Sequence, residues 1–352
     1  MEYSKQSLII LSTWIHPVMG GGELYLEKLI RPQSNFFNIY LISNNKTVID
    51  YLFKFIIPIE EIYYRNNFLF NVASLFKLRK QLGKNHTVVL NGQGAFYYSL
   101  FSFVLFKKTV AIQHQLLTAE KSNIKRFLKI IALVFTNKVV TVSKPLADEI
   151  NIYKSKTTII NNWVNLAFLE RILSFKYQIF GDTLNLLYIA RVEENKGIKD
   201  LVNAIKNVDN VHLTVLGNGT LTDWISSQNL KEKITLAGWQ TDIIPFVNES
   251  HLLIQPSYVE GLPFVPIEMG VAGLPALLSD IPVHKEISKD GEFAFLFSVG
   301  SVESLTEQIK KLSLNRILLM GMSEKIKKHY QDNYLESDKF VNAYRRAFQI
   351  ID

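Results

Sequence analysis

Short apolar runs alternate with amphipathic segments along almost the whole chain of 352 residues. Runs of this length, closed by glycine, proline or polar residues, predict strands that are buried on both faces of a parallel sheet. The expected strands are residues 7–12, 37–42, 87–90, 109–112, 138–142, 157–160, 184–190, 211–216, 234–236, 252–255, 276–279 and 294–297. Strands that alternate with helices in this way predict an α/β fold with doubly wound parallel sheets.

The alternation is weakest between residues 163 and 182, and we expect the main domain boundary there. A chain of 352 residues also favours two domains over one. We therefore predict a first Rossmann-like domain over residues 1–172 and a second over residues 173–335. Amphipathic helices are expected over residues 315–330 and 337–351, and residues 336–352 form a separate C-terminal helical segment.

Two glutamates, Glu260 and Glu268, stand eight positions apart just after the predicted strand 252–255. The first lies at the carboxyl end of that strand and the second falls in the second turn of the helix that follows, so both carboxylates can reach one ligand. The alternative is an ordinary strand-to-helix junction with two solvated glutamates, since acidic residues near helix starts are favoured in any case.

The residues between the glutamates favour an anion site. Gly261 permits a tight turn, and Pro263 suits the first helical position. The backbone N–H groups of Phe264 and Val265 would then lie in the opening turn, where a helix presents donors to an anion.

The Glu-Gly-Leu-Pro segment, the spacing of the glutamates and the following Met-Gly-Val-Ala-Gly-Leu-Pro resemble the donor-binding signature of the retaining glycosyltransferases of family 4, which have the GT-B fold. The resemblance implies that Glu260 lies by the donor sugar and that Glu268 binds the ribose hydroxyls. It places Gly261, Leu262, Phe264 and Val265 in the donor-binding turn. The chain departs from the family at Met269 and Gly270, where alanine and methionine are usual, so the helix is expected to pack differently there.

Arg191 and Lys196 follow the predicted strand 184–190, and strand ends are where α/β proteins bind ligands. An arginine fork and a lysine point charge can converge on a diphosphate. The pair is similar to the arginine and lysine-glycine motif of the same family. The alternative is a surface loop that carries ordinary charges.

Two features of the first domain are also similar to the family. Gly20 and Gly21 match the Gly-Gly-x-Glu loop, where glycine lets the backbone approach a phosphate. The spacing differs from the Gly-x-Gly-x-x-Gly of dinucleotide-binding folds. His114, directly after residues 109–112, matches a family histidine close to the donor sugar, although a lone histidine is more often structural. The remaining histidines show no metal-ligand spacing.

Composition limits the classes of protein to which this chain can belong. The chain has no cysteine, which excludes disulfides and thiolate nucleophiles and fits a cytoplasmic location. Its start does not resemble a signal peptide, and its longest apolar stretch, residues 95–106, is shorter than the about 20 residues that span a bilayer. We expect neither a cofactor nor a metal, since no Asp-x-Asp motif is present.

Charged residues are divided unevenly between the two halves of the chain. Residues 1–172 hold 21 Lys and Arg against 10 Asp and Glu, a balance of +11, and residues 173–352 hold 18 against 22, a balance of −4. The basic half favours an anionic partner, and no nucleic-acid-binding pattern is visible. Residues 121–135 place four cations beside a wide apolar face, which suits an interfacial helix as well as a helix packed on the sheet. These cations are Lys121, Lys125, Arg126 and Lys129.

The expected protein is therefore a two-domain GT-B enzyme whose domains face a cleft, with the last helix returning to the first domain as in GT-B proteins. It would transfer a sugar from a nucleotide sugar, most simply a UDP-sugar, with retention and without a metal, while Glu260 and His114 hold the sugar. The expected acceptor is a lipid-linked glycan of a bacterial surface polysaccharide at the inner face of the plasma membrane. Two alternatives stay open: a nucleotide-sugar 2-epimerase of the same fold, and a non-catalytic sugar-nucleotide-binding subunit.

Overall fold

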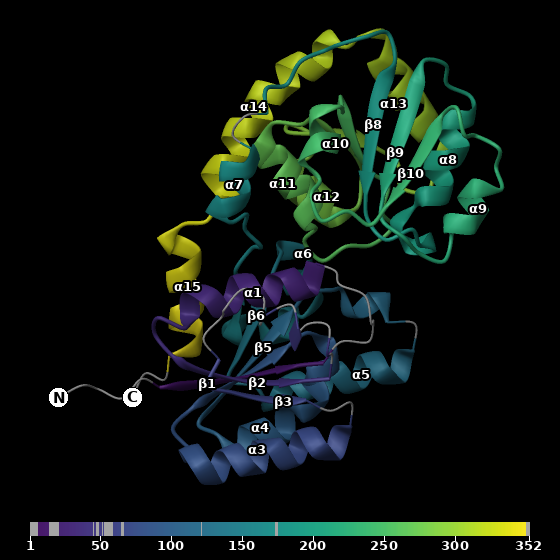
Figure 1. The fold of residues 1–352 in the computed structure, drawn as a ribbon. Helices are drawn as coiled ribbons and strands as arrows, with labels where there is room; N and C mark the ends of the chain where they lie inside the picture. The colour runs from purple at the N-terminus through teal and green to yellow at the C-terminus, as the bar shows by residue number, and fades with distance from the viewer. Residues whose placement is uncertain are drawn as a thin grey trace. The chain divides into compact units, whose positions relative to one another are not determined.

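The computed structural model describes residues 6–13, 21–44, 46, 49–50, 52, 59–64, 67–120, 122–172 and 175–349, with residues 21–24 described in their backbone only. The chain divides into two compact units, shown in Figure 1. Unit 1 comprises Met1–Asn162 and Ser337–Asp352, and unit 2 comprises Trp163–Glu336. The sequence predicted these divisions at residues 172 and 335.

Unit 1 is built on a parallel sheet, which in the described residues has seven strands in the order β3-β2-β1-β4-β5-β6-β7. The strands are β1 (Ser7–Ser12), β2 (Asn38–Ser43), β3 (Glu61–Tyr64), β4 (Thr87–Asn91), β5 (Lys108–Gln113), β6 (Lys138–Thr141) and β7 (Thr157–Ile159). All but β3 were predicted to within a few residues. β3 lies at the edge of the sheet, where one side of a strand needs no apolar cover, so its charged and aromatic sequence carries no buried-strand pattern.

Helices cover both faces of this sheet, with α3 and α4 on one face and α1 and α15 on the other (Figure 1). The α15 helix packs on α1, where the hydroxyl of Tyr25 donates to that of Tyr344 at 2.6 Å. The helices of unit 1 are α1 (Gly21–Gln33), α3 (Phe68–Leu82), α4 (Ser99–Leu105), α5 (Asn123–Ala132), α6 (Lys144–Glu149) and α15 (Asp338–Phe348), with short 3-10 helices η1 (Gln93–Tyr98), η2 (Leu117–Ala119), η3 (Leu133–Phe135) and η4 (Asn151–Lys156).

Unit 2 has a second parallel sheet, with six strands among the described residues in the order β10-β9-β8-β11-β12-β13. The strands are β8 (Leu184–Ile189), β9 (Val211–Leu216), β10 (Ile234–Gly238), β11 (Leu252–Gln255), β12 (Ala276–Ser279) and β13 (Phe295–Phe297). Its helices are α7 (Leu166–Ile172), η5 (Glu194–Lys196), α8 (Ile198–Lys206), α9 (Thr222–Ser226), α10 (Ile244–Asn248), α11 (Phe264–Ala272), α12 (Pro282–Ser288), α13 (Val302–Leu314) and α14 (Ile317–Tyr334). The two sheets confirm the predicted doubly wound α/β fold class.

The α11 helix is packed closely on α14, and its unusual residues explain how. Met269 is fully buried, and Gly270 lies so near the ring of Tyr330 that a Cβ atom there would be 2.4 Å from it. A larger residue at position 270 would push the two helices apart, so glycine at this position is required by the contact.

Among the described residues, none of the helices has both the length and the apolar character that crossing a bilayer requires.

Candidate active site

The strand order of unit 2 reverses between β8 and β11, which lie side by side although they are far apart in the sequence. Chain connections leave such a point toward opposite faces of the sheet, and ligands of open α/β sheets bind at the carboxyl ends of the strands there. Arg191 and Lys196 follow β8, and Glu260 follows β11. The topology therefore brings these predicted residues to one end of the sheet.

Lys196 and Glu260 form a direct ion pair, with 2.6 Å between Nζ and Oε1. Their side chains are only 15% and 11% exposed. The same carboxylate oxygen accepts hydrogen bonds from the Ser257 hydroxyl at 2.8 Å and from Gln255 Nε2 at 3.3 Å. Burial alone would raise the pKa of Glu260, but Lys196 and the Ser257 hydroxyl outweigh it, so the pKa lies below its usual value. Glu260 is a carboxylate at neutral pH.

Close contact between two loops makes this ion pair possible. Gly197 has a φ of +69°, and a Cβ atom there would lie 1.9 Å from the carbonyl oxygen of Pro256. Next to it, the backbone N–H of Tyr258 donates to the Asn195 carbonyl at 3.0 Å. Only glycine fits the Gly197 position, because it tolerates a positive φ and leaves room for the Pro256 carbonyl.

Arg191 lies in the same β8-to-α8 loop but has a different partner. Its guanidinium pairs with Glu193 at 3.0 Å, and both side chains are partly exposed. The buried Tyr188 hydroxyl donates to the Arg191 carbonyl at 2.9 Å and fixes the backbone of the loop. Tyr188 thus fixes the backbone of Arg191, and the partly exposed carboxylate of Glu193 holds its guanidinium.

The helix after the glutamate begins at Phe264, one residue later than the sequence predicted. Pro263 precedes the helix with a ψ of 132°, so it is a capping residue with extended backbone and not the first helical residue. Gly261 and Leu262 are buried, whereas Val265 in the first turn and Glu268 in the second are partly exposed. Glu268 therefore remains accessible on α11 at the same end of the sheet.

A buried polar network lies beneath Glu260, and the sequence analysis missed it. The Ser279 hydroxyl donates to the Ser257 carbonyl at 2.6 Å, and His284 Nδ1 lies 2.9 Å from the Ser279 carbonyl. Because a carbonyl only accepts, His284 carries its proton on Nδ1. Burial lowers the pKa of His284 to about 4. Gln255 closes the network from β11.

The signal that would have found these residues is a polar side chain at the end of an otherwise apolar strand. Gln255 and Ser279 each end a run of buried aliphatic residues, at the carboxyl ends of β11 and β12. The apolar pattern alone identifies both residues only as strand ends. Their place in the network comes from the contact of Gln255 with Glu260 and from that of Ser279 with the Ser257 carbonyl.

Unit 1 holds the other predicted residues. Gly21 is the first residue of α1, whereas Gly20 lies outside the described residues. His114 directly follows β5, and its Nε2 lies 2.8 Å from Oδ1 of Asn91 at the end of β4. The Asn91 amide nitrogen donates in turn to the Ser12 hydroxyl at the end of β1. These contacts join the carboxyl ends of three neighbouring strands.

His114 is a neutral imidazole in this setting. Burial lowers its pKa to about 3, and its ring packs edge-on against Tyr25 with 4.3 Å between the centroids. Since Asn91 Oδ1 accepts, Nε2 carries the proton. His114 is therefore held in one tautomer and one orientation, and it can orient a ligand but carries no charge at neutral pH.

The predicted cationic face over residues 121–135 needs a correction. Lys129 is buried, and its ammonium pairs with Glu120 at 2.7 Å and donates to Gln93 Oε1 at 3.0 Å. A buried lysine must be paired, and this pairing removes Lys129 from the set of surface cations. Lys125 remains exposed, Arg126 is partly exposed, and Lys121 lies outside the described residues.

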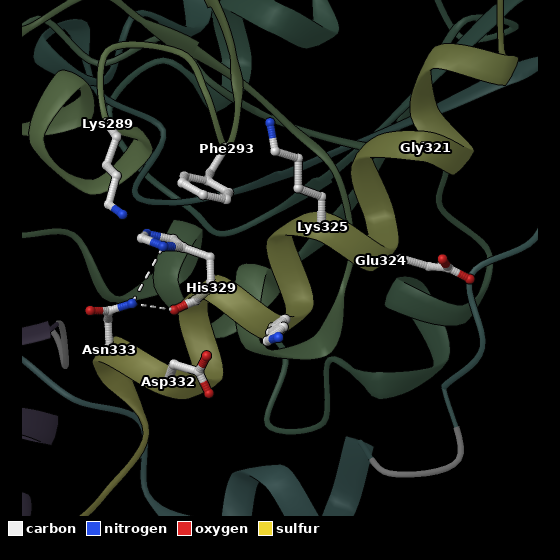
Figure 2. A pocket seen from close by; sticks show the side chains of 9 residues that line it. Lys289, Phe293, Gly321, Glu324, Lys325, His329, Asp332 and Asn333 are labelled. Carbon is white, nitrogen blue, oxygen red and sulfur yellow. Dashed lines mark hydrogen bonds between the residues drawn. The ribbon is translucent and has the colours of Figure 1, made fainter.

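A separate pocket of about 600 Å³ lies at α14 of unit 2, and none of the predicted site residues line it. Figure 2 shows the His329 ring, which stacks on Phe293 with 3.8 Å between the centroids, among the side chains of Lys289, Lys325 and Asp332. Within the part of the chain that the structure describes, no three His, Asp or Glu side chains are grouped as a metal site would require.

A lysine–glutamate pair at the switch point of a parallel sheet, with a second glutamate on the adjoining helix, is an arrangement that suits a phosphorylated ligand. Residues 170–329 match the family described as "Glycosyl transferases group 1". This match covers just under half of the chain, and over these residues it confirms the resemblance found in the sequence.

Curated relatives are distant. The lipopolysaccharide core biosynthesis glycosyltransferase LpsE of Rhizobium meliloti is 22% identical over 49% of this chain and 52% of its own length. The UDP-Gal:alpha-D-GlcNAc-diphosphoundecaprenol alpha-1,3-galactosyltransferase of Escherichia coli is 26% identical over 42% of this chain and 40% of its own length. The chain thus spans about half the length of the curated relatives that it matches.

Solved structures extend the similarity of fold to nearly the whole chain. HepE of Anabaena in complex with UDP aligns with a TM-score of 0.81 at 16% identity, covering 97% of this chain and 99% of that one. A sucrose-phosphate synthase of Thermosynechococcus elongatus aligns with a TM-score of 0.77 at 14% identity over similar shares. At such identities the similarity shows the fold, and the fold is of the GT-B type.

Proposed function

We propose that this protein is a retaining glycosyltransferase that moves a sugar from a UDP-sugar to a hydroxyl of a glycan acceptor. The observation that carries the proposal is the Lys196–Glu260 pair at the switch point of unit 2, with Glu268 on the adjoining α11. Support comes from the family of residues 170–329 and from the UDP complex of the structurally similar HepE.

In the proposed reaction, the bond between the anomeric carbon and the diphosphate oxygen breaks and a bond to the acceptor oxygen forms on the same face. The acceptor proton passes to the leaving phosphate. Arg191 and Lys196 stabilise the charge that develops on the diphosphate, and the donors of the α11 opening turn add to it. Glu260 holds the sugar and Glu268 binds the ribose. His114, Gly20 and Gly21 of unit 1 are further donor-binding residues of the proposal.

Lys196 has two partners in this proposal. Without donor it neutralises Glu260, and with donor it faces the diphosphate as well. Because Glu260 also accepts from Ser257 and Gln255, its position does not depend on Lys196 alone. The donor can therefore recruit the lysine while the carboxylate stays in place.

We further propose that the acceptor is a lipid-linked glycan of a bacterial surface polysaccharide, reached at the cytoplasmic face of the plasma membrane. The relatives named above support this, since one is described by lipopolysaccharide core biosynthesis and another by a diphosphoundecaprenol acceptor. The excess of Lys and Arg in the first half of the chain suits an anionic acceptor.

The test is a screen of UDP-, GDP- and ADP-sugars by thermal shift and by release of nucleotide diphosphate. We expect a UDP-sugar to raise the melting temperature most and to be consumed faster with a lipid-linked oligosaccharide acceptor. Lys196→Ala should lower kcat/KM by about 100-fold or more, because the developing charge loses a nearby cation. The matched control is Lys231→Ala, which changes an exposed lysine of the same unit. No response to any UDP-sugar would refute the proposal.

Two further outcomes separate the alternatives. If the donor alone is converted to an epimer, as followed by NMR, the protein is a 2-epimerase and needs no acceptor. If UDP-sugars bind but no chemistry occurs with any acceptor, it is a binding subunit. Activity should persist in EDTA because the cationic side chains take the leaving charge, and loss of activity restored by manganese would contradict the metal-independent mechanism.

A further inference from the structure

The outer surfaces of α3, α4 and α5 expose apolar side chains at helical spacing. On α5 these are Ile124, Phe127, Leu128 and Ile131, and on α4 they are Leu100, Phe103 and Val104. Leu69 and Phe76 continue the pattern on α3. Their exposed fractions range from 39% to 74%. Single exposed apolar residues need no explanation, but aligned rows on three helices do.

The three helices form one continuous surface. Phe68 of α3 packs edge-on against Phe101 of α4, with 6.0 Å between the ring centroids. Phe103 of α4 packs in the same manner against Phe135 of η3, directly after α5, at 6.3 Å. Buried residues of α3 and α5 belong to one core cluster, so these helices pack on the same core.

The α5 helix is turned against the usual preference of a helix that flanks a sheet. Its lysine at position 129 is buried and paired with Glu120, while Ile124 and Phe127 face outward. A surface helix normally buries its apolar stripe and exposes its charges. Burying the charge and exposing the apolar stripe costs free energy in water, and this cost is recovered when an apolar medium covers the stripe.

Charge on these helices points to an anionic medium. All residues of α3, α4 and α5 are described, and together the helices carry Lys77, Arg79, Lys80, Lys125, Arg126 and Lys129 but no Asp or Glu. Lys77 pairs with Glu61 of β3, and Lys129 is buried. Of the remaining four cations, Lys80 and Lys125 are exposed, and Arg79 and Arg126 are partly exposed. An apolar stripe bordered by cations is the arrangement of helices that lie in the interface of an anionic bilayer.

We propose that the outer surface of α3, α4 and α5 docks on an anionic lipid bilayer and inserts its apolar side chains among the lipids. The inference deepens the proposed function and rests on its lipid-linked acceptor, for which it supplies the surface that meets the membrane. Apolar insertion contributes most of the binding, and the cations add an electrostatic part. Binding therefore survives high salt in part, unlike binding by cations alone.

The test is flotation with vesicles of phosphatidylglycerol and phosphatidylethanolamine, at low salt and at about 0.5 M salt, where charges are screened within a few ångströms. The Ile124→Gln/Phe127→Gln/Ile131→Gln variant should lower the partition coefficient about tenfold or more at both salt concentrations. Lys125→Gln/Arg126→Gln should lower it at low salt and change it little at high salt. Wild type should bind phosphatidylcholine vesicles more weakly.

The matched control is Leu314→Gln/Ile317→Gln/Met320→Gln, which removes three exposed apolar side chains from unit 2. It should float as wild type does. The proposal is overturned if wild type stays with the protein fraction, if the two triple variants float alike, or if the α5 substitutions convert a dimer of this chain to monomers while vesicle binding is unchanged. UDP binding, measured by calorimetry on each variant, shows that unit 2 is intact. Absence of UDP binding in wild type would refute the proposed function and leave the docking result standing.

Discussion

At the scale of single residues, the site depends on two charges that neutralise each other in a largely buried place. Lys196 and Glu260 are each more than four-fifths buried, and Glu260 also accepts from Ser257 and Gln255. Either charge alone would destabilise the fold there, because the desolvation penalty of an unpaired buried ion is not offset by attraction to a partner. The pairing therefore makes it possible to keep both charges in a largely buried place.

This leads to a prediction about unfolding. Lys196→Met and Glu260→Gln should each lower the free energy of unfolding by about 3 kcal/mol, since each leaves one partner without its counterpart. The double variant should lose less than the sum of the two by at least about 1 kcal/mol. Urea unfolding of the wild type, the two single variants and the double variant gives the four free energies of unfolding. Additive losses would mean that the two side chains do not interact in solution.

The two glutamates should separate by function. Glu260→Gln should lower kcat about 100-fold or more with the dissociation constant of UDP nearly unchanged, because in the proposed function this carboxylate faces the sugar. Glu268→Gln should raise that dissociation constant about tenfold, the usual effect of losing a charged hydrogen-bond partner. Calorimetry with UDP and steady-state kinetics measure both, and Glu232→Gln, an exposed change in the same unit, is the control. The reverse pattern would exchange the two roles.

At the scale of elements, the contact between α11 and α14 holds the helix that carries Glu268. A Cβ atom at Gly270 would be 2.4 Å from the ring of Tyr330, and that ring is almost fully buried and packs near Tyr334. The ring cannot move into open space, so any displacement is passed to the α11 helix itself. A change at position 270 thus affects the position of Glu268, two residues before it.

Gly270→Ala should lower the free energy of unfolding by about 1–3 kcal/mol, the usual cost of overpacking, and weaken UDP binding in parallel. Adding Tyr330→Leu should recover part of the UDP affinity. The control is Gly321→Ala on α14, where no atom lies within 4 Å of the added methyl group and the helix should become slightly more stable. Equal effects of the two alanines would show that helix propensity, and not the contact, decides.

At the scale of the whole molecule, buried neutral histidines in both units make stability depend on pH. Burial lowers the pKa of His114 in unit 1 to about 3, and lowers those of His251 and His284 in unit 2 to about 4. In the unfolded chain each would take a proton near pH 6.5. The stabilisation is therefore complete above pH 6.5 and is lost as the pH falls toward 4 and then 3.

We expect the free energy of unfolding to fall by about 2 kcal/mol for each of these histidines between pH 7 and pH 5. His114→Gln and His284→Gln should each reduce this loss by about that amount, although both variants start from lower stability at pH 7. Urea titrations at the two pH values measure the difference. A loss that is the same in wild type and both variants would show that these imidazoles do not titrate between the two pH values.

Sequence pattern and structure agree where neighbours in the chain decide the outcome. The apolar runs predicted the strands because a strand buried on both faces needs aliphatic residues at successive positions. The edge strand β3 escaped the prediction because one side of it is open, and Pro263 was placed one residue too far into its helix. The motif around Glu260 and Glu268 was recognisable because its spacing is set within one loop and one helix.

Contacts between distant parts of the chain lie outside such local patterns. The pairing of Lys196 with Glu260 requires two loops to meet at Gly197, and the network of Gln255, Ser279 and His284 requires neighbouring strand ends to align. The orientation of α5 was open to two interpretations, because an amphipathic sequence shows that a helix has two faces and not which face meets the sheet. The structure answers that question, because Lys129 is buried and paired with Glu120 while Ile124 and Phe127 are exposed.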